Sequence, residues 1–192
     1  MKNLKKALIA GTCSVLLVAG SVAGTMAWLQ DTDSVTNTFT VGAVDITLDE
    51  KDVDNSTDGK DRDQANTYKI FPGQTYEKDP IVHVDANSED AWLFVRVENN
   101  LTQIEADTTI AAQMAENGWT LVEGETNVFA LATTVAGGAN KNVFENFTIS
   151  GTVDNTTLSQ YEDTTIDVTA YAVQAEGFAT PKAAWDATFG NK

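Results

Sequence analysis

Apolar and polar residues alternate along several short stretches of the chain, as they do in β-strands that bury one face. The cleanest alternation runs over residues 164–174. In residues 91–98 both alternating sets are largely apolar, so both faces of that strand are expected to be partly covered. Less regular alternations predict further strands at 37–49, 68–71, 75–84, 119–123, 127–134 and 143–150.

Breaks in these patterns predict turns and irregular backbone. In the first predicted strand the apolar phase slips by one residue at Gly42, where a β-bulge would return both halves to one core. Pro72 and Gly73 predict a turn, because proline fixes φ and glycine tolerates positive φ. Pro80 predicts a break or a sheet edge within residues 75–84.

Helical spacing is confined to short segments. Residues 107–117 predict a helix capped by Asp107 or Thr108. Residues 156–161 predict one helical turn, and residues 181–189 predict a C-terminal helix that starts with proline. Many short strands and few helices together predict an all-β fold, an antiparallel β-sandwich of jelly-roll type with one or two short peripheral helices.

The N-terminus has the three parts of a secretory signal peptide. Three lysines within the first six residues precede an uncharged apolar run, and small residues at Thr25 and Ala27 provide a cleavage site. We expect cleavage between Ala27 and Trp28. Cys13 lies near the start of the apolar run rather than after it, so lipidation is not expected, and the mature chain contains no cysteine.

Three segments follow from these features: a signal peptide at 1–27, an N-terminal arm at 28–36 and the β-sandwich domain at 37–192. The signal carries three lysines and no acids, so its removal changes the net charge from −16 to −19. Such a surface repels nucleic acid and anionic lipid. The mature protein is therefore expected to be secreted, with neither nucleic acid nor a membrane as its partner.

Few residues indicate catalysis. His83 is the only histidine and lies in a predicted strand, where a half-exposed structural role is expected. A zinc protease motif of the His-Glu-x-x-His type does not occur, nor does a nucleophile elbow. Since the chain has 28 acidic residues, close carboxylate pairs arise by chance and do not indicate a glycosidase. No catalytic residue is expected.

The loop at residues 52–63 is the cluster that most resembles a binding site. Asp54, Asp58 and Gly59 follow the first half of a calcium loop, but Ala65 stands where the bidentate glutamate belongs. We expect a solvated acidic loop and no cofactor. The residues leave calcium as the alternative, with Asp52, Asp54, Asp58 and Asp61 as its ligands.

Several short motifs follow one another in a characteristic order along the chain. Residues 24–32 read Gly-Thr-Met-Ala-Trp-Leu-Gln-Asp-Thr, and residues 37–42 read Asn-Thr-Phe-Thr-Val-Gly before an alternating strand. Later segments contain Phe-Pro-Gly-Gln at 71–74 and Asp-Pro at 79–80. Residues 167–178 read Asp-Val-Thr-Ala-Tyr-Ala-Val-Gln-Ala-Glu-Gly-Phe and are followed by Ala-Ala-Trp at 183–185. Together these motifs resemble the TasA/camelysin family.

The resemblance implies export with a SipW-type signal peptidase and a jelly-roll fold. It also implies extracellular fibres of the biofilm matrix, in which the N-terminal segment of one subunit completes a sheet in the next. Camelysin itself is described as a cell-surface metalloprotease, but this chain has no zinc motif to support that activity. The implied location is the extracellular matrix or cell surface of a Gram-positive-type bacterium.

The arm that cleavage would create is suited to strand donation. It is polar, has no helical stripe and directly precedes a predicted strand, so its backbone can pair with the open sheet edge of another subunit. Trp28 and Leu29 are the expected anchors. The residues assigned to the assembly arm are Trp28, Leu29, Asp31, Thr32 and Val35.

We therefore predict a non-enzymatic structural subunit that self-associates into fibres and contacts other matrix proteins. A cell-surface adhesin or binding module is the first alternative, and a persistent monomer would indicate it. A camelysin-like metalloprotease is the second alternative, and casein cleavage that a chelator abolishes would indicate it.

Overall fold

The computed structural model describes residues 42–56, 59–106 and 108–190, and every structural statement below concerns these ranges. The predicted signal peptide and arm lie outside them. Within them, no helix combines the length and the apolar character needed to cross a membrane.

The described elements are mostly short strands. In chain order they are β1 (Ile46–Lys51), β2 (Arg62–Asp63), β3 (Thr75–Glu77), β4 (Ile81–Val84), β5 (Ala91–Asn99), α2 (Ile110–Glu116), β6 (Trp119–Leu121), β7 (Val128–Leu131), β8 (Asn140–Asn142), β9 (Asn146–Thr148), α3 (Asn155–Leu158), a 3-10 turn (Ser159–Tyr161), β10 (Ile166–Gln174) and α4 (Pro181–Thr188).

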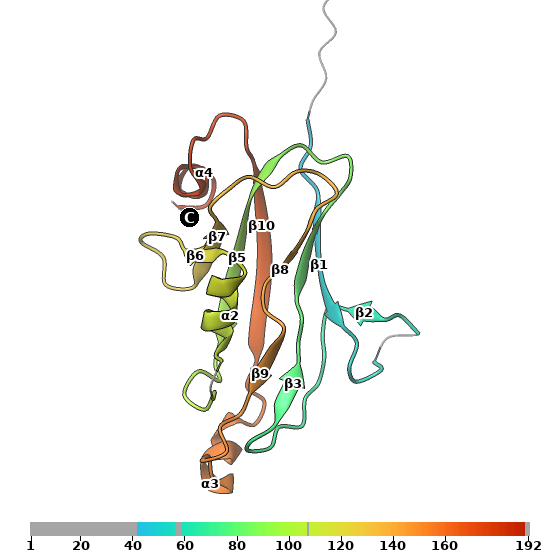
Figure 1. Ribbon diagram of the computed structural model, residues 1–192, viewed down its shortest axis with the longest axis vertical. Helices are drawn as coiled ribbons and strands as arrows, with labels where there is room; N and C mark the ends of the chain where they lie inside the picture. Colours follow the sequence, from blue (N-terminus) through green and yellow to red (C-terminus); the bar gives the residue numbers. More distant parts are fainter. Residues whose placement is uncertain (1–41, 57–58, 107, 191–192) are drawn as a thin grey trace, which may run out of the picture. The chain divides into compact units, whose positions relative to one another are not determined.

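The strands form antiparallel sheets. One sheet has the order β2-β1-β4-β8, a second has the order β10-β5-β7-β6, and β3 pairs with β9. The β3–β9 pair continues the β4–β8 pair along the long axis (Figure 1), because Lys78 N donates to Glu145 O and Val143 N donates to Pro80 O between them. The predicted all-β sandwich with short helices is therefore confirmed.

The main hydrophobic core lies between the two larger sheets. β4 contributes Val82 and Val84, and β5 contributes Leu93, Val95 and Val97. The core continues beneath β3 and β9, where the rings of Tyr76 and Phe147 stack with their centroids 5.1 Å apart. Burial of these alternating side chains holds the two sheets together, because apolar area removed from water is the dominant favourable term in folding.

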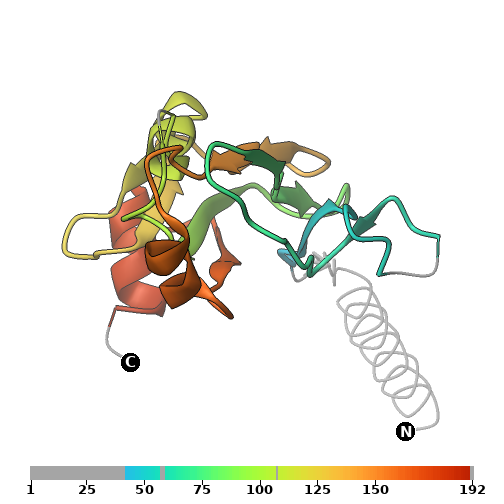
Figure 2. The same cartoon turned by 90° about the horizontal axis from the view of Figure 1, so that it is seen from below.

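A second core covers the outer face of the sheet that contains β5, and α4 forms its lid (Figure 2). Trp92 and Phe94 on β5 point into it, and the Phe94 and Trp185 rings lie 5.1 Å apart. Thr180 caps α4 by accepting a hydrogen bond from Ala183 N, so the helix starts at Pro181, directly after its cap. Both faces of β5 are thus covered, as its sequence predicts.

The N-terminal strand differs from its prediction. Residues 37–41 lie outside the described ranges, residues 42–45 are not strand, and β1 continues to Lys51. None of the described strands includes Gly42, so the predicted bulge is not found among the described residues. A Cβ atom at Gly42 would lie 2.8 Å from Glu89 Cγ, a contact that the exposed and flexible Glu89 side chain can relieve by moving.

Two further predictions are wrong in detail. Residues 68–71 are not a strand, because Phe71 N donates to the Tyr76 hydroxyl rather than to a neighbouring strand. α2 begins at Ile110, and Thr109 caps it in place of Asp107 or Thr108, with Thr109 Oγ1 accepting from Ala112 N. β8 was not predicted, since its polar sequence shows no alternation and its pairing with β4 is made by the backbone.

Trp185→Ala tests the second core. Trp185 is 2% exposed and packs against Phe94 and Tyr171, so its truncation should lower the free energy of unfolding by about 3–5 kcal/mol. Urea unfolding followed by fluorescence or circular dichroism measures the change. Leu121→Ala is the control, since Leu121 is 52% exposed and its loss should cost less than about 0.5 kcal/mol. Equal losses in the two variants would contradict this assignment.

Candidate functional site: an open sheet edge beside a groove

β10 has one paired edge and one open edge. It pairs with β5 along all nine of its residues, and no other described strand pairs with it. Asn100 N donates to Thr165 O and Ala175 N donates to Asp90 O, so the backbone groups of odd-numbered residues face β5. The N–H and C=O groups of the even-numbered residues, from Ile166 to Gln174, therefore point away from β5, toward the edge at which no described strand pairs.

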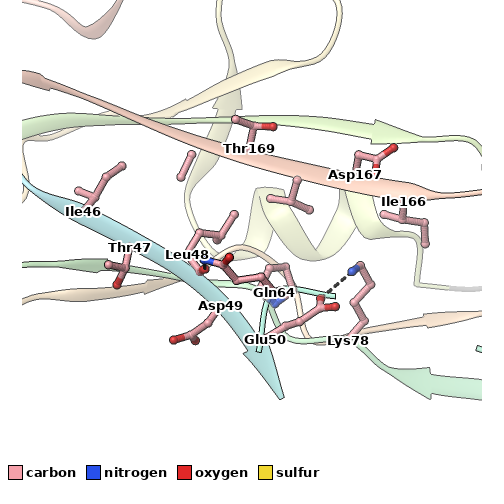
Figure 3. A pocket seen from close by; sticks show the side chains of 13 residues that line it. Ile46, Thr47, Leu48, Asp49, Glu50, Gln64, Lys78, Ile166, Asp167 and Thr169 are labelled. Carbon is pink, nitrogen blue, oxygen red and sulfur yellow. Dashed lines mark hydrogen bonds and ion pairs between the residues drawn. The ribbon is translucent and has the colours of Figure 1, made fainter. Parts of the chain in front are cut away.

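A groove of about 630 Å³ lies beside this edge, between β1 and β10 (Figure 3). The side chains that line it come from the two strands and from the segments around Gln64 and Lys78. Its apolar lining consists of Ile46, Leu48, Pro80, Ile166, Val168 and Ala170. Its polar lining consists of Thr47, Asp49, Glu50, Gln64, Lys78, Asp167 and Thr169.

The hydrophobic core is incompletely covered at the groove. The core-facing side chains of β10 are only half-buried, whereas those of the neighbouring β5 are buried. On β1, Ile46 and Leu48 are also half-buried. The half-buried residues of β10 that pack on the core are Ile166, Val168, Ala170 and Ala172.

The edge formed by β6 and β8 is closed in a way that the β1–β10 edge is not. Trp119 Nε1 on β6 donates to Asn142 O on β8 at 2.7 Å, and Asn117 Nδ2 donates to Val143 O. α2 also inserts Met114, which is 1% exposed, into the main core. The β6–β8 edge is therefore bridged by side-chain hydrogen bonds.

A network of charged side chains ties β1 to its neighbours. The Arg62 guanidinium binds the Asp49 carboxylate and also Asp79 at 2.8 Å. His83 Nε2 lies 3.0 Å from Asp49 Oδ1, and His83 Nδ1 lies 2.8 Å from Asn140 Oδ1. Burial opposes ionisation of Asp49, but the hydrogen bonds from Arg62 and His83 outweigh it and hold the pKa of Asp49 below its ordinary 3.8. His83 is thus partly exposed on β4 and hydrogen-bonded within the sheet.

The acidic loop brings together a different set of carboxylates from the predicted one. Oxygen atoms of Asp52, Asp54 and Asp63 all lie within 4.8 Å of one another. Asp61 is exposed and is not in this group, although its carbonyl accepts a hydrogen bond from Asp52 N. Asp58 lies outside the described residues. Sequence reasoning did not single out Asp63, because its burial follows from pairing in a two-residue strand that shows no periodicity.

The assembly residues predicted from the sequence lie outside the described ranges. Cleavage and strand donation therefore stay predictions. The residues concerned are Ala27, Trp28, Leu29, Asp31, Thr32 and Val35.

Acid should weaken the network around Asp49. Because folding lowers its pKa below 3.8, its contribution to stability is present above that pH and is lost as the pH falls through the lowered value. The melting temperature of the wild type should therefore fall more steeply below pH 3.8 than that of Asp49→Asn. Asp61→Asn controls for the loss of one exposed negative charge, and parallel curves for wild type and Asp49→Asn would contradict the prediction.

The calcium alternative stays a prediction, which titration tests. Binding at the carboxylates of Asp52, Asp54 and Asp63 should raise the melting temperature by about 2–4 °C for each kcal/mol that calcium adds to the free energy of unfolding. Calcium is varied up to the millimolar range, which is typical of extracellular sites. The rise should be absent in Asp54→Asn, and an unchanged wild-type melting temperature would rule calcium out.

The chain was compared with known families, curated proteins and solved structures. Residues 1–70 match the model of a family described as camelysin metallo-endopeptidase. The match reaches β1 and β2 but not β10. No curated protein matches, and no solved structure does. Over residues 1–70 the chain is therefore similar to the camelysin metallo-endopeptidase family, which confirms the resemblance to the TasA/camelysin family in that part of the sequence.

Proposed function

We propose that this protein is a secreted structural subunit of the extracellular biofilm matrix and that it assembles into fibres by strand donation. The observation that carries the proposal is the open edge of β10 beside a groove with an apolar lining. In this arrangement the N-terminal arm of one subunit pairs with β10 of the next. Backbone hydrogen bonds supply affinity and side-chain pockets supply register.

The dimensions of the two parts are compatible. The predicted arm has nine residues, from 28 to 36, and β10 also has nine. In a paired arm, alternate side chains enter the groove and cover the half-buried core residues of β1 and β10. The arm contains Trp28, Leu29 and Val35 as apolar residues for this purpose. Burying them removes apolar area of both subunits from water, which favours association.

Charge makes this contact selective. The protein is strongly acidic, and Asp49 and Asp167 line the groove, so non-specific association of two copies is opposed by electrostatic repulsion. Backbone pairing does not depend on side-chain charge. A donated strand therefore overcomes a repulsion that keeps other surfaces of two subunits apart.

Export and assembly are coupled in this proposal. A SipW-type signal peptidase cuts between Ala27 and Trp28, and the arm gains a free N-terminus only after this cut. The uncut precursor cannot donate the arm, so fibres form outside the cell. Other matrix proteins are further partners of the growing fibre.

Deleting residues 28–36 from the purified mature protein should abolish filaments in electron micrographs. Ala170→Pro should have the same effect from the acceptor side, because Ala170 N–H points to the open edge and proline lacks this donor. Leu121→Ala is the control, because Leu121 is exposed on β6 and does not line the groove, and it should leave filaments intact. Melting curves verify that each variant remains folded.

Filaments that persist after the deletion would overturn strand donation. A wild-type protein that stays monomeric would instead favour the binding module. The description of the matched family keeps a metallo-endopeptidase as the enzymatic alternative. Chelator-sensitive casein cleavage by the purified protein would support that activity.

A further inference from the structure

Buried charge is concentrated where β1 meets β2. Among the described residues, the buried polar or charged side chains are Glu50, Asp63 and Gln113. Glu50 and Asp63 lie directly opposite each other in the β1–β2 pair. Two carboxylates in this position repel each other unless other groups compensate for their charge. The side chains around Glu50 therefore need a specific explanation.

Glu50 holds a lysine and an asparagine at the same time. Lys78 Nζ lies 2.6 Å from Glu50 Oε2, and Asn66 Nδ2 donates to Glu50 Oε1 at 3.0 Å. The Lys78 and Glu50 side chains are only 11% and 6% exposed. One carboxylate thus contacts an amine on one oxygen and an amide nitrogen on the other (the Lys78–Glu50 contact is drawn in Figure 3).

The carbonyl of the same amide is also bound. Asn66 Oδ1 accepts a hydrogen bond from Val53 N at 2.7 Å. A backbone N–H in this position polarises the carbonyl and stabilises negative charge that develops on its oxygen. Asn66 Nδ2 also donates to Lys51 O at 2.8 Å and to Asp63 Oδ1 at 3.3 Å, so the amide plane is held firmly.

We propose that Lys78 and Asn66 form an intramolecular isopeptide bond and that Glu50 is the catalytic residue for its formation. The four parts required for amide transfer converge at this place: a nucleophilic amine, an amide carbon, a donor to the carbonyl oxygen and a carboxylate that contacts both the attacking and the leaving nitrogen. The inference does not depend on fibre assembly.

The reaction balances without an oxidant or a co-reactant. Glu50 takes a proton from the Lys78 ammonium group, and the neutral Nζ attacks Asn66 Cγ. The tetrahedral intermediate carries its negative charge on Oδ1, opposite the Val53 N–H. Glu50 then delivers a proton to Nδ2, the Cγ–Nδ2 bond breaks and ammonia leaves. The remaining proton of the attacking nitrogen is lost with the ammonia as ammonium, and the new Nζ–Cγ amide remains.

The Lys78–Glu50 ion pair is largely removed from water. Burial deprives both charges of hydration, and this desolvation offsets much of the attraction between them. Tyr68 lies in the same surroundings. Its burial is the largest cause, and the charge of Glu50 the second, of a hydroxyl pKa above the ordinary value.

The isopeptide bond would give this chain an intramolecular covalent cross-link, which a disulfide cannot provide. With a single cysteine, at position 13, no intramolecular disulfide can form. The isopeptide bond would join the loop that follows β2 to the residue between β3 and β4. It would thereby hold Lys78, which lines the groove, in place by a covalent bond.

Intact mass in denaturant is the decisive measurement. After N-terminal sequencing defines the chain, the purified wild type should be lighter than its sequence requires by one ammonia. Trypsin should yield a branched peptide that joins residues 63–69 to residues 70–96, because acylated Lys78 resists cleavage. A wild-type mass equal to the sequence mass would overturn the proposal.

Variants assign the roles. Lys78→Arg keeps the positive charge but removes the nucleophile, and Glu50→Gln keeps the shape but removes the proton carrier, so both should have the full sequence mass. Lys182→Arg is the matched control, since Lys182 forms an exposed ion pair with Asp186 at 2.7 Å and should retain the ammonia loss of the wild type. An ammonia loss in Glu50→Gln, or its absence in Lys182→Arg, would overturn the assignment. Circular dichroism verifies that each variant is folded.

Discussion

Burial of both faces of β5 is the constraint on which the rest of the structure depends. Leu93, Val95 and Val97 require a sheet on one side, and Trp92 and Phe94 require a cover on the other. The first requirement is met by the sheet of β1 and β4, and the second by α4. The layer order therefore follows from one nine-residue strand, because each of its faces would otherwise expose apolar area to water.

The same sheet order leaves β10 at an edge. A long strand with open hydrogen-bonding groups normally invites pairing with other chains, and proteins usually blunt such edges. Within β10, Asp167 is the one charged residue that could blunt the edge. The core-facing side chains of β10 are small or only half-buried at the groove. An edge of this kind is a liability in a monomer and an acceptor in an assembly. In the proposed fibre the donated strand pairs with β10, because the β6–β8 edge is closed.

The β1–β2 junction concentrates polar groups, and both strands lie within residues 1–70, the part of the chain that matches the camelysin model. Glu50 and Asn66 belong to this part, whereas Lys78, which contacts Glu50, lies beyond it. The acidic loop with Asp52 and Asp54 adjoins them. Buried ion pairs contribute little net stability, because desolvation offsets their attraction. The proposed isopeptide chemistry therefore explains the burial of Glu50 and Lys78 better than stability alone. The outward network of Arg62, by contrast, remains partly exposed and joins neighbouring strands.

Local pattern identified those elements whose side chains decide their own structure. The alternation of residues 91–98 and 164–174 predicted β5 and β10 within two residues of their observed ends, and proline with an apolar spacing of four predicted α4. Periodicity failed where the backbone alone makes the pairing, as in β8, or where an apolar segment packs without pairing, as at Tyr68 and Ile70. The helix cap was displaced to Thr109 because several adjacent polar residues could serve.

The sequence by itself determined the all-β class, the strongly acidic surface, the covered faces of β5 and the resemblance at the N-terminus. Only the tertiary structure decided that β10 is an edge strand, that Asp63 joins Asp52 and Asp54, and that Glu50 contacts both Lys78 and Asn66. The physical reason is the range of the interactions. Periodicity and turn chemistry act between near neighbours, whereas sheet order and side-chain clusters arise from contacts between segments that the sequence does not pair.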